Sequence, residues 1–152
     1  MTLQVLSALH PLVEGGVIPP EQWLRKSYGG GSERQSAIVW LASYCAAHNQ
    51  RAKLVRRLMA SLPMSLPLHS IGQCMHNRDE PLLVSKQSDG GGNASTWKSK
   101  VRAISQYAVC LIAESSMARD YVTEKLFHAF AAGCLPIYYG TEDVSVFLPK
   151  PT

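Results

Sequence analysis

The sequence predicts an α/β fold, in which helices flank a parallel β-sheet. Short apolar segments of strand length alternate with segments whose apolar residues recur every three or four positions, as they do on one face of a helix. In the best-defined unit, the strand Tyr107 to Ala113 is followed by a loop, a helix and a second strand in "CLPIYYG". A strand–helix–strand unit of this kind joins two parallel strands of one sheet.

The length and composition indicate one globular domain. A chain of 152 residues is the usual size of a domain and is long enough to bury a real core. Its hydrophobic content of 46% and charged content of 17% are ordinary for a globular protein, which excludes a disordered or fibrous chain. No run of about 20 apolar residues is present, and the N-terminus lacks a basic region. We therefore expect neither a membrane anchor nor a signal peptide.

The N-terminal part is expected to contain two strands around one helix. Residues 1–36 predict no clear domain, because prolines interrupt the first 28 residues and "YGGGSER" is typical of a linker. The first clear strand is Ala37 to Ser43. The helix Gln50 to Leu62 follows, with an apolar stripe, and Pro63 ends it. A second strand is predicted in "LPLHSIG".

The next segments are shorter. A loop is expected from Met75 to Thr96, because it contains the glycine-rich "SDGGGNAS". That stretch also carries a glycosylation sequon at Asn93. A short helix is predicted from Trp97 to Ser105, and another helix could start within Thr141 to Leu148.

The helix between the last two strands carries the most informative polar residues. We expect Asp120 to cap its N-terminus and Gly133 to follow its C-terminus. Apolar side chains occupy one face, and a second face carries Tyr121, Glu124, Lys125 and His128. The helix dipole disfavours a lysine in the first turn, so Lys125 there indicates an anionic ligand. The alternative is that Glu124 and Lys125 form only a solvated surface pair.

Two basic residues are expected to meet at one edge of the sheet. Arg51 comes after the first strand and Lys125 after a later one. Ligands of parallel sheets bind at the carboxyl ends of the strands, so these cations could share a diphosphate. Two basic groups could form a phosphate-attracting mouth: Arg51, Lys53, Arg56 and Arg57, and Lys98, Lys100 and Arg102. Aromatic residues do not interleave with them, so we expect no nucleic-acid partner.

The cysteines give no sign of a metal site. None of the four forms a C-x-x-C pair, so zinc is not expected. Cys110 and Cys134 are predicted to be free cysteines in buried strands, where they behave as small apolar residues. Cys74 and His76 could bind a metal, but two ligands do not make a site.

The stretch "RDYVTEKLFHAFAAGCLPIYYG" resembles the donor-binding signature of the α1,3/4-fucosyltransferases, glycosyltransferase family 10. That signature runs D-Y-V-T-E-K, an apolar helix, then A-G-x-x-P-v-x-x-G, and it fits here in register from Asp120 to Gly140. "YAVCLIAESS" looks like the family's Y-K-F-x-x-x-F-E-N-S strand, and "SIGQC" looks like Y-G-x-C. The segment before Arg51 looks like S-N-C…R, and "VFLPKPT" looks like the start of F-x-P-P-x-S-F.

The resemblance implies a fold and a set of site residues. Residues 37–152 would form a GDP-fucose-binding, Rossmann-like domain, like the C-terminal half of a GT-B glycosyltransferase but truncated at its C-terminus. The catalytic set would be Arg51 and Lys125, which hold the diphosphate, with Glu124, which contacts the nucleoside or sugar. The remaining donor-binding residues would be Glu114, Ser115, Tyr121 and Thr123.

The resemblance also implies an activity. Family members transfer L-fucose from GDP-fucose to a glycan hydroxyl, with inversion and in an α1,3-type linkage, as part of protein glycosylation. Arg51 and Lys125 could take the electrostatic role of a metal, so no cofactor would be required; stimulation by a divalent cation stays open. Eukaryotic members are usually membrane-anchored Golgi proteins. The sequence indicates neither the acceptor nor the oligomeric state.

Two departures from the family pattern leave alternatives open. Ser115 and Tyr44 stand where the family has asparagines. The acceptor half, with the carboxylate that would take the acceptor proton, is expected to lie outside this chain. The chain could therefore be a non-catalytic nucleotide-binding or interaction fragment, or a related transferase that uses another sugar nucleotide.

Overall fold

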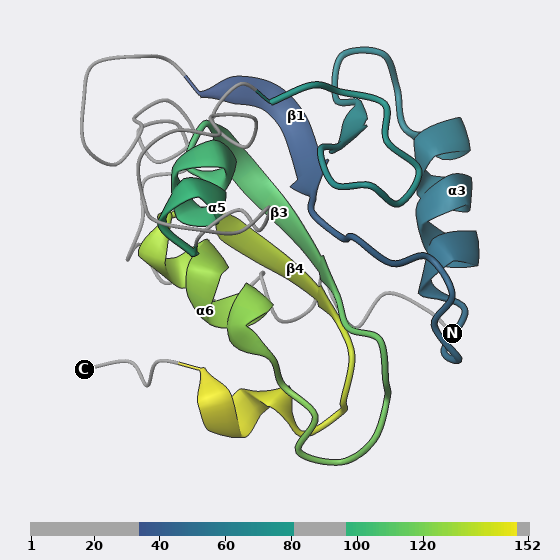
Figure 1. The fold of residues 1–152 in the computed structure, drawn as a ribbon, viewed down its shortest axis with the longest axis vertical. Coiled ribbons are helices and arrows are strands. Elements are labelled where there is room, and N and C mark those ends of the chain that lie inside the picture. The colour runs from purple at the N-terminus through teal and green to yellow at the C-terminus, as the bar shows by residue number, and fades with distance from the viewer. Residues whose placement is uncertain (1–33, 81–96, 149–152) are drawn as a thin grey trace, which may run out of the picture.

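The chain folds around a four-stranded parallel sheet with helices on both faces (Figure 1). The computed structural model describes residues 34–80 and 97–148. The strands lie in the order β2-β1-β3-β4, and each neighbouring pair is parallel. Their bounds are β1 Gln35–Trp40, β2 Leu68–Ser70, β3 Tyr107–Ala113 and β4 Leu135–Tyr139. The predicted α/β fold with a parallel sheet and flanking helices is confirmed.

Three α-helices and a short 3₁₀ helix accompany the sheet in the described residues. Helix α3 (Arg51–Ser61) lies on one side of the sheet, whereas α5 (Trp97–Ile104) and α6 (Glu124–Ala131) lie on the other (Figure 1). Each differs from its predicted bounds by a residue or a few, and α3 and α6 have the predicted amphipathic pattern. The segment from Thr141 forms only the 3₁₀ helix Val144–Phe147.

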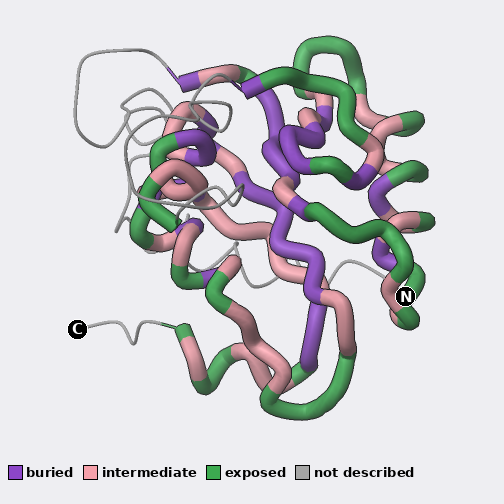
Figure 2. The backbone as a smooth tube through the Cα atoms, viewed as in Figure 1, coloured by how far each residue is buried: buried purple, intermediate pink, exposed green. Residues whose placement is uncertain are grey.

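The alternation of side chains along β3 divides the core into two clusters. Cys110 and Ile112 pack with Val39 of β1 and with Leu126 of α6. Leu111 and Ala113 point to the opposite face, where Val55 of α3 packs. Figure 2 shows the buried backbone running along β1 and β3, the two central strands. Both faces of these strands are covered, so their sequences are almost continuously apolar.

The first strand differs from its predicted bounds. It runs from Gln35 to Trp40 and does not reach Ser43. Beyond Trp40 the chain contacts the turn after β2, because the carbonyl of Ala42 accepts a hydrogen bond from the Cys74 amide at 2.9 Å. Gly72 permits this approach, since a Cβ there would lie 2.3 Å from the Ala42 carbonyl oxygen.

The last strand was predicted to be buried, and that prediction was wrong. All five residues of β4 are only partly buried. In the part of the chain that the structure describes, β4 pairs with β3 alone and forms an edge of the sheet. An apolar run cannot by itself distinguish a central strand from an edge strand.

The prediction that Cys110 and Cys134 are free was also wrong. They form a disulfide, and a second disulfide joins Cys45 to Cys74. Cys110 pairs with Pro136 in the β3–β4 register, so Cys134 lies close by, with 5.8 Å between the two cysteine Cα atoms. The sequence separations within the pairs, 24 and 29 residues, gave no indication that these cysteines would meet.

Several predictions fall on residues outside those described. Nearly all of the segment 1–36 that predicts no clear domain, including most of the linker Tyr28 to Arg34, lies there, as does the sequon at Asn93. The predicted loop from Met75 to Thr96 is described only as far as Glu80, and up to that point it forms turns and irregular structure.

Candidate nucleotide site

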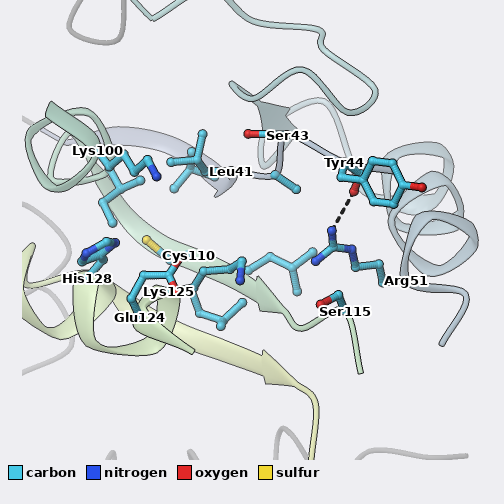
Figure 3. Close-up of a pocket in the computed structure, with 15 residues that line it drawn as sticks. Leu41, Ser43, Tyr44, Arg51, Lys100, Cys110, Ser115, Glu124, Lys125 and His128 are labelled. Carbon is cyan, nitrogen blue, oxygen red and sulfur yellow. Dashed lines mark hydrogen bonds between the residues drawn. The ribbon is translucent and has the colours of Figure 1, made fainter. Parts of the chain in front are cut away.

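A pocket of about 260 Å³ opens at the carboxyl ends of the strands (Figure 3). Its floor is apolar and includes Val39, Leu41 and Ile112. Its polar rim comes from the loop after β1, the start of α3, helix α5 and the first turns of α6: Tyr44, Arg51, Lys100, Glu124, Lys125 and His128. An apolar floor with a few convergent polar groups is the usual form of a small-molecule site in an α/β protein.

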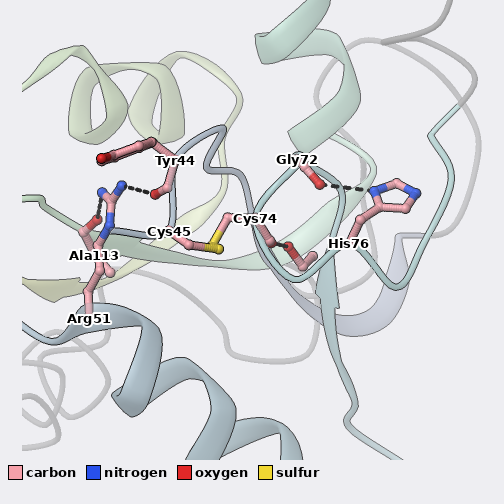
Figure 4. The surroundings of a disulfide bond; sticks show 8 residues. Tyr44, Cys45, Arg51, Gly72, Cys74, His76 and Ala113 are labelled. Atoms are coloured by element: carbon pink, nitrogen blue, oxygen red, sulfur yellow. Dashed lines mark hydrogen bonds between the residues drawn. A yellow bond between two sulfur atoms is a disulfide. The ribbon is translucent and has the colours of Figure 1, made fainter. Parts of the chain in front are cut away.

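Arg51 reaches the pocket from the first position of α3. Only 4% of it is exposed. Its Nη1 donates to the carbonyl of Ala113 at 2.9 Å, and its Nη2 donates to the carbonyl of Tyr44 at 2.6 Å (Figure 4). The guanidinium therefore joins the end of β3 to the loop after β1. Burial lowers its pKa, and nearby Glu114 opposes that shift.

Much of the hydrogen-bonding capacity of Arg51 is still available. Its buried Nε has no hydrogen-bond partner among the described residues. A guanidinium carries five N–H donors, so the two backbone contacts leave others unused in a side chain that lines the pocket. The two contacts also fix the plane of the group, which favours bidentate binding of phosphate.

Lys125 reaches the same pocket from the first turn of α6. Its Nζ donates to the hydroxyl of Thr123 at 2.8 Å and to Oε2 of Glu114 at 3.3 Å. Its side chain is 27% exposed, so it is held yet accessible. Arg51 and Lys125 were expected at one edge of the sheet, and the structure brings both to one pocket.

The start of α6 differs from the prediction. Asp120 does not cap the helix; Thr123 occupies the N-cap position, and Asp120 lies in a turn with φ of 60°. The Thr123 hydroxyl donates to Glu114 and accepts from Lys125, so it makes no capping hydrogen bond to the helix backbone. Oε1 of Glu114 also accepts a hydrogen bond from the Thr123 amide at 2.9 Å, and the carboxylate from the end of β3 thus holds the N-cap residue. Gly133, with φ of 61°, ends the helix as predicted.

The other predicted donor-binding residues lie around the pocket in different ways. Ser115 lines it, and its hydroxyl hydrogen-bonds the hydroxyl of Tyr121 at 2.8 Å. Tyr121 precedes α6 and so does not share the helix face with Glu124. Glu114 has no exposed surface, and Thr123 points toward it. Direct donor contact by Glu114, Tyr121 and Thr123 stays a prediction.

The pocket contains two residues that were not predicted as site residues. Lys100 had been assigned only to a basic group, and His128 only to the polar face of the helix. Both line the pocket, whereas Lys53, Arg56 and Arg57 are exposed on α3 away from it. The shared face of Glu124, Lys125 and His128 was the signal that could have identified His128.

His128 lines the pocket as a neutral imidazole. Desolvation lowers its pKa from the usual value, and the charges of Lys100 and Lys125 lower it further. Glu124 has the opposite effect but is outweighed. At neutral pH this side chain can therefore donate or accept a hydrogen bond without adding charge.

In the described ranges, 34–80 and 97–148, no group of three or more His, Cys, Asp or Glu residues could hold a metal ion. Cys74 belongs to a disulfide, and His76 contacts the carbonyl of Gly72 and the carboxylate of Asp79. The same residues contain no helix that is long and apolar enough to cross a membrane.

Known proteins resemble this chain over most of its length. GDP-fucose protein O-fucosyltransferase 3 of Gallus gallus is 31% identical over 119 residues, which cover 78% of this chain and 23% of that protein. An alpha-(1,4)-fucosyltransferase of Arabidopsis thaliana is 34% identical over 117 residues, covering 74% of this chain and 28% of that protein. A crystal structure of an alpha1,3-fucosyltransferase aligns with a TM-score of 0.49 and 21% identity, over 88% of this chain and 29% of that one.

The chain spans about a quarter of the length of the curated relatives it matches. A sequence profile described as "Glycosyltransferase family 10 (fucosyltransferase) C-term" matches residues 31–152. That match includes the whole pocket. The chain therefore belongs to glycosyltransferase family 10, the fucosyltransferases, through the C-terminal domain of that family.

Proposed function

We propose that the pocket binds the diphosphate of GDP-fucose and that the protein transfers L-fucose from this donor to a hydroxyl group. The observation that carries the proposal is the convergence of Arg51 and Lys125 on one pocket from two different helices. Family membership supports fucose as the transferred sugar. The name of the Gallus gallus relative, GDP-fucose protein O-fucosyltransferase 3, supports GDP-fucose as the form in which that sugar is supplied.

The charges suit the departure of the nucleotide. When the bond from fucose to the diphosphate breaks, negative charge grows on the β-phosphate oxygens. Cations that are already fixed in place stabilise that developing charge more than they stabilise the bound donor, and this difference lowers the barrier. Arg51 is fixed by two backbone carbonyls, and Lys125 by Thr123 and Glu114.

The remaining donor contacts follow from the rim of the pocket. Glu124 is exposed at the start of α6 and can accept hydrogen bonds from sugar or ribose hydroxyls. Ser115 and the Tyr121 hydroxyl form a second polar edge. Glu114 and Thr123 act behind the pocket by holding Lys125. The proposal also includes inversion at the anomeric carbon, an α1,3-type linkage to a glycan, and a role in Golgi glycosylation.

A transfer experiment can identify both the transferred sugar and the acceptor. The matched relatives include protein O-fucosyltransferases as well as an alpha-(1,4)-fucosyltransferase, so the acceptor hydroxyl belongs to a protein or a glycan. Labelled GDP-fucose would be incubated with the protein and with glycan and glycoprotein acceptors, and competed with GDP, GDP-mannose and UDP-galactose. Fucose transfer that GDP blocks and UDP-galactose does not would support the proposal.

Other outcomes favour the alternatives. Preferential transfer from a different sugar nucleotide would identify a related transferase with another donor. Nucleotide binding without transfer to any acceptor would indicate a non-catalytic nucleotide-binding module.

A further inference from the structure

Lys100 is a third cation of the pocket, and it comes from a part of the chain outside the quoted donor signature. It lies on α5, which packs on the opposite face of the sheet from α3 (Figure 1). It lines the same pocket as Arg51 and Lys125. Building on the proposed donor site, we infer that Lys100 contacts one phosphate of the donor while Arg51 contacts the other. Lys100 thereby makes the pocket selective for a diphosphate.

The positions of Arg51 and Lys100 indicate what length of anion could contact both. Arg51 is anchored at the start of α3 by the carbonyls of Tyr44 and Ala113. Lys100 approaches from α5, and Figure 3 shows its amine at the other end of the pocket, beyond Leu41. Lys125 lies between these two cations in the same view. Cations spread along a pocket in this way suit an extended anion with two linked phosphates better than a single phosphate.

The charge balance also requires a third cation. Glu114 pairs with Lys125 at 3.3 Å, and Glu124 adds a second carboxylate at the rim. These two carboxylates offset the charges of Arg51 and Lys125. His128 is neutral at pH 7, because burial and the two lysines lower its pKa. The positive charge that remains for an anionic ligand is therefore that of Lys100.

Lys98 offers a matched control on the same helix. It is exposed, does not line the pocket, and its amine lies 5.8 Å from the ring centroid of Trp97. Two positions along a helix correspond to about 200°, so Lys98 and Lys100 point in nearly opposite directions. Replacing either one removes the same charge from the protein, and only the place of that charge differs.

The test compares Lys100→Gln with Lys98→Gln in the full chain by calorimetric titration with GDP, GMP, inorganic pyrophosphate and phosphate. Thermal melting first checks that each variant is folded. We expect Lys100→Gln to weaken the binding of GDP and pyrophosphate about tenfold, the effect of losing one charged hydrogen bond. GMP binding should change less than about twofold, and Lys98→Gln should match the wild type. Lys100→Arg should restore GDP binding.

The outcomes separate this inference from the proposed function. Selective GDP binding by the wild type, with unchanged affinity in Lys100→Gln, would overturn the role of Lys100 and leave the donor site intact. Equal losses for GDP and GMP in that variant would overturn the selectivity for a diphosphate. Pyrophosphate binding by a wild type that does not bind GDP would contradict the proposed donor, while the comparison with Lys98→Gln still decides on Lys100. A folded wild type that binds none of the four ligands would overturn both.

Discussion

Glu114 and Lys125 form an ion pair between the end of β3 and the first turn of α6, with 3.3 Å between Oε2 and Nζ. The carboxylate has no exposed surface, and its other contacts are the amide and hydroxyl of Thr123. One buried side chain thus holds both the N-cap residue of α6 and a cation at the pocket. The backbone carbonyl of Glu114 also accepts a hydrogen bond from the side chain of Asn49 at 2.7 Å. Asn49 lies two residues before Arg51, so Glu114 contacts the segments that carry both cations.

Removing the buried carboxylate should destabilise the fold. Glu114→Ala leaves the amide of Thr123 and the charge of Lys125 without their partner, and breaking a buried pair on one side typically costs about 3–5 kcal/mol. Glu114→Gln keeps an acceptor for the amide and should cost less. Urea unfolding measures both. Glu142→Gln removes an exposed carboxylate and should change the free energy of unfolding by less than about 0.5 kcal/mol. Equal stability of Glu114→Ala and Glu142→Gln would contradict this role.

Replacing Lys125 should weaken nucleotide binding. Lys125→Ala removes a cation that we propose contacts the diphosphate, and the loss of a charged hydrogen bond corresponds to about 1–3 kcal/mol in GDP affinity. Lys125→Arg keeps the charge and should retain more affinity. Lys53→Ala, on the exposed face of α3, is the control. Titration calorimetry on folded variants makes the comparison. Wild-type affinity for GDP in the Lys125→Ala variant would show that Lys125 does not contribute to nucleotide binding.

His128 should make donor binding depend on pH. Desolvation and two lysines lower its pKa below the usual 6.5, so it is neutral at pH 7 and gains a positive charge on acidification. GDP-fucose affinity should therefore increase as the pH falls through this lowered pKa, by about fivefold if the added attraction is roughly 1 kcal/mol. The groups that face His128 are Lys100, Glu124 and Lys125. His128→Gln should give a flat profile, and a wild-type profile that is equally flat would exclude this role.

The lowered pKa of His128 also makes the stability of the fold depend on pH, but in the opposite direction to donor binding. The unfolded chain binds the proton of His128 more tightly than the folded protein does. This contribution to the free energy of unfolding is present above pH 6.5 and is lost as the pH falls through the lowered pKa. Acid should thus favour donor binding while it disfavours the fold.

Reduction of the disulfides should destabilise the sheet and its loops. Cys110–Cys134 links β3 to the residue just before β4 across 24 residues, and Cys45–Cys74 links the loops after β1 and β2 across 29. Loops of this length predict about 2–4 kcal/mol for each bond from the entropy of the unfolded chain. Cys110→Ser with Cys134→Ser, and Cys45→Ser with Cys74→Ser, separate the two contributions in urea unfolding. Unfolding curves that match the wild type for both double variants would contradict a stabilising role of the two disulfides.

The sequence predicted the parts of the fold that depend on local pattern. The bounds of β3 were predicted to the residue, and the amphipathic periods of α3 and α6 were predicted to within a few residues. Since Arg51 and Lys125 both follow strands, the parallel arrangement alone was enough to place them at one edge. The resemblance to the family supplied the nature of the ligand.

The errors come from contacts between segments far apart in the chain. Asp120 is a good N-cap by type, but Thr123 is the N-cap, and its amide is bound by Glu114, which lies outside the helix. The disulfide of Cys110 depends on the β3–β4 register, which no local pattern encodes. Lys100 gained its position in the pocket because α5 packs against α6.

Calorimetric titration of the purified chain with GDP, with UDP as the control, tests the central claim most directly. Circular dichroism would first establish that the chain is folded. The account predicts that GDP binds with a measurable heat, since Arg51 and Lys125 line one pocket. UDP should bind much more weakly, because the donor that we propose carries guanosine rather than uridine. A folded chain that binds neither nucleotide would contradict it, and the donor signature would then serve only the fold.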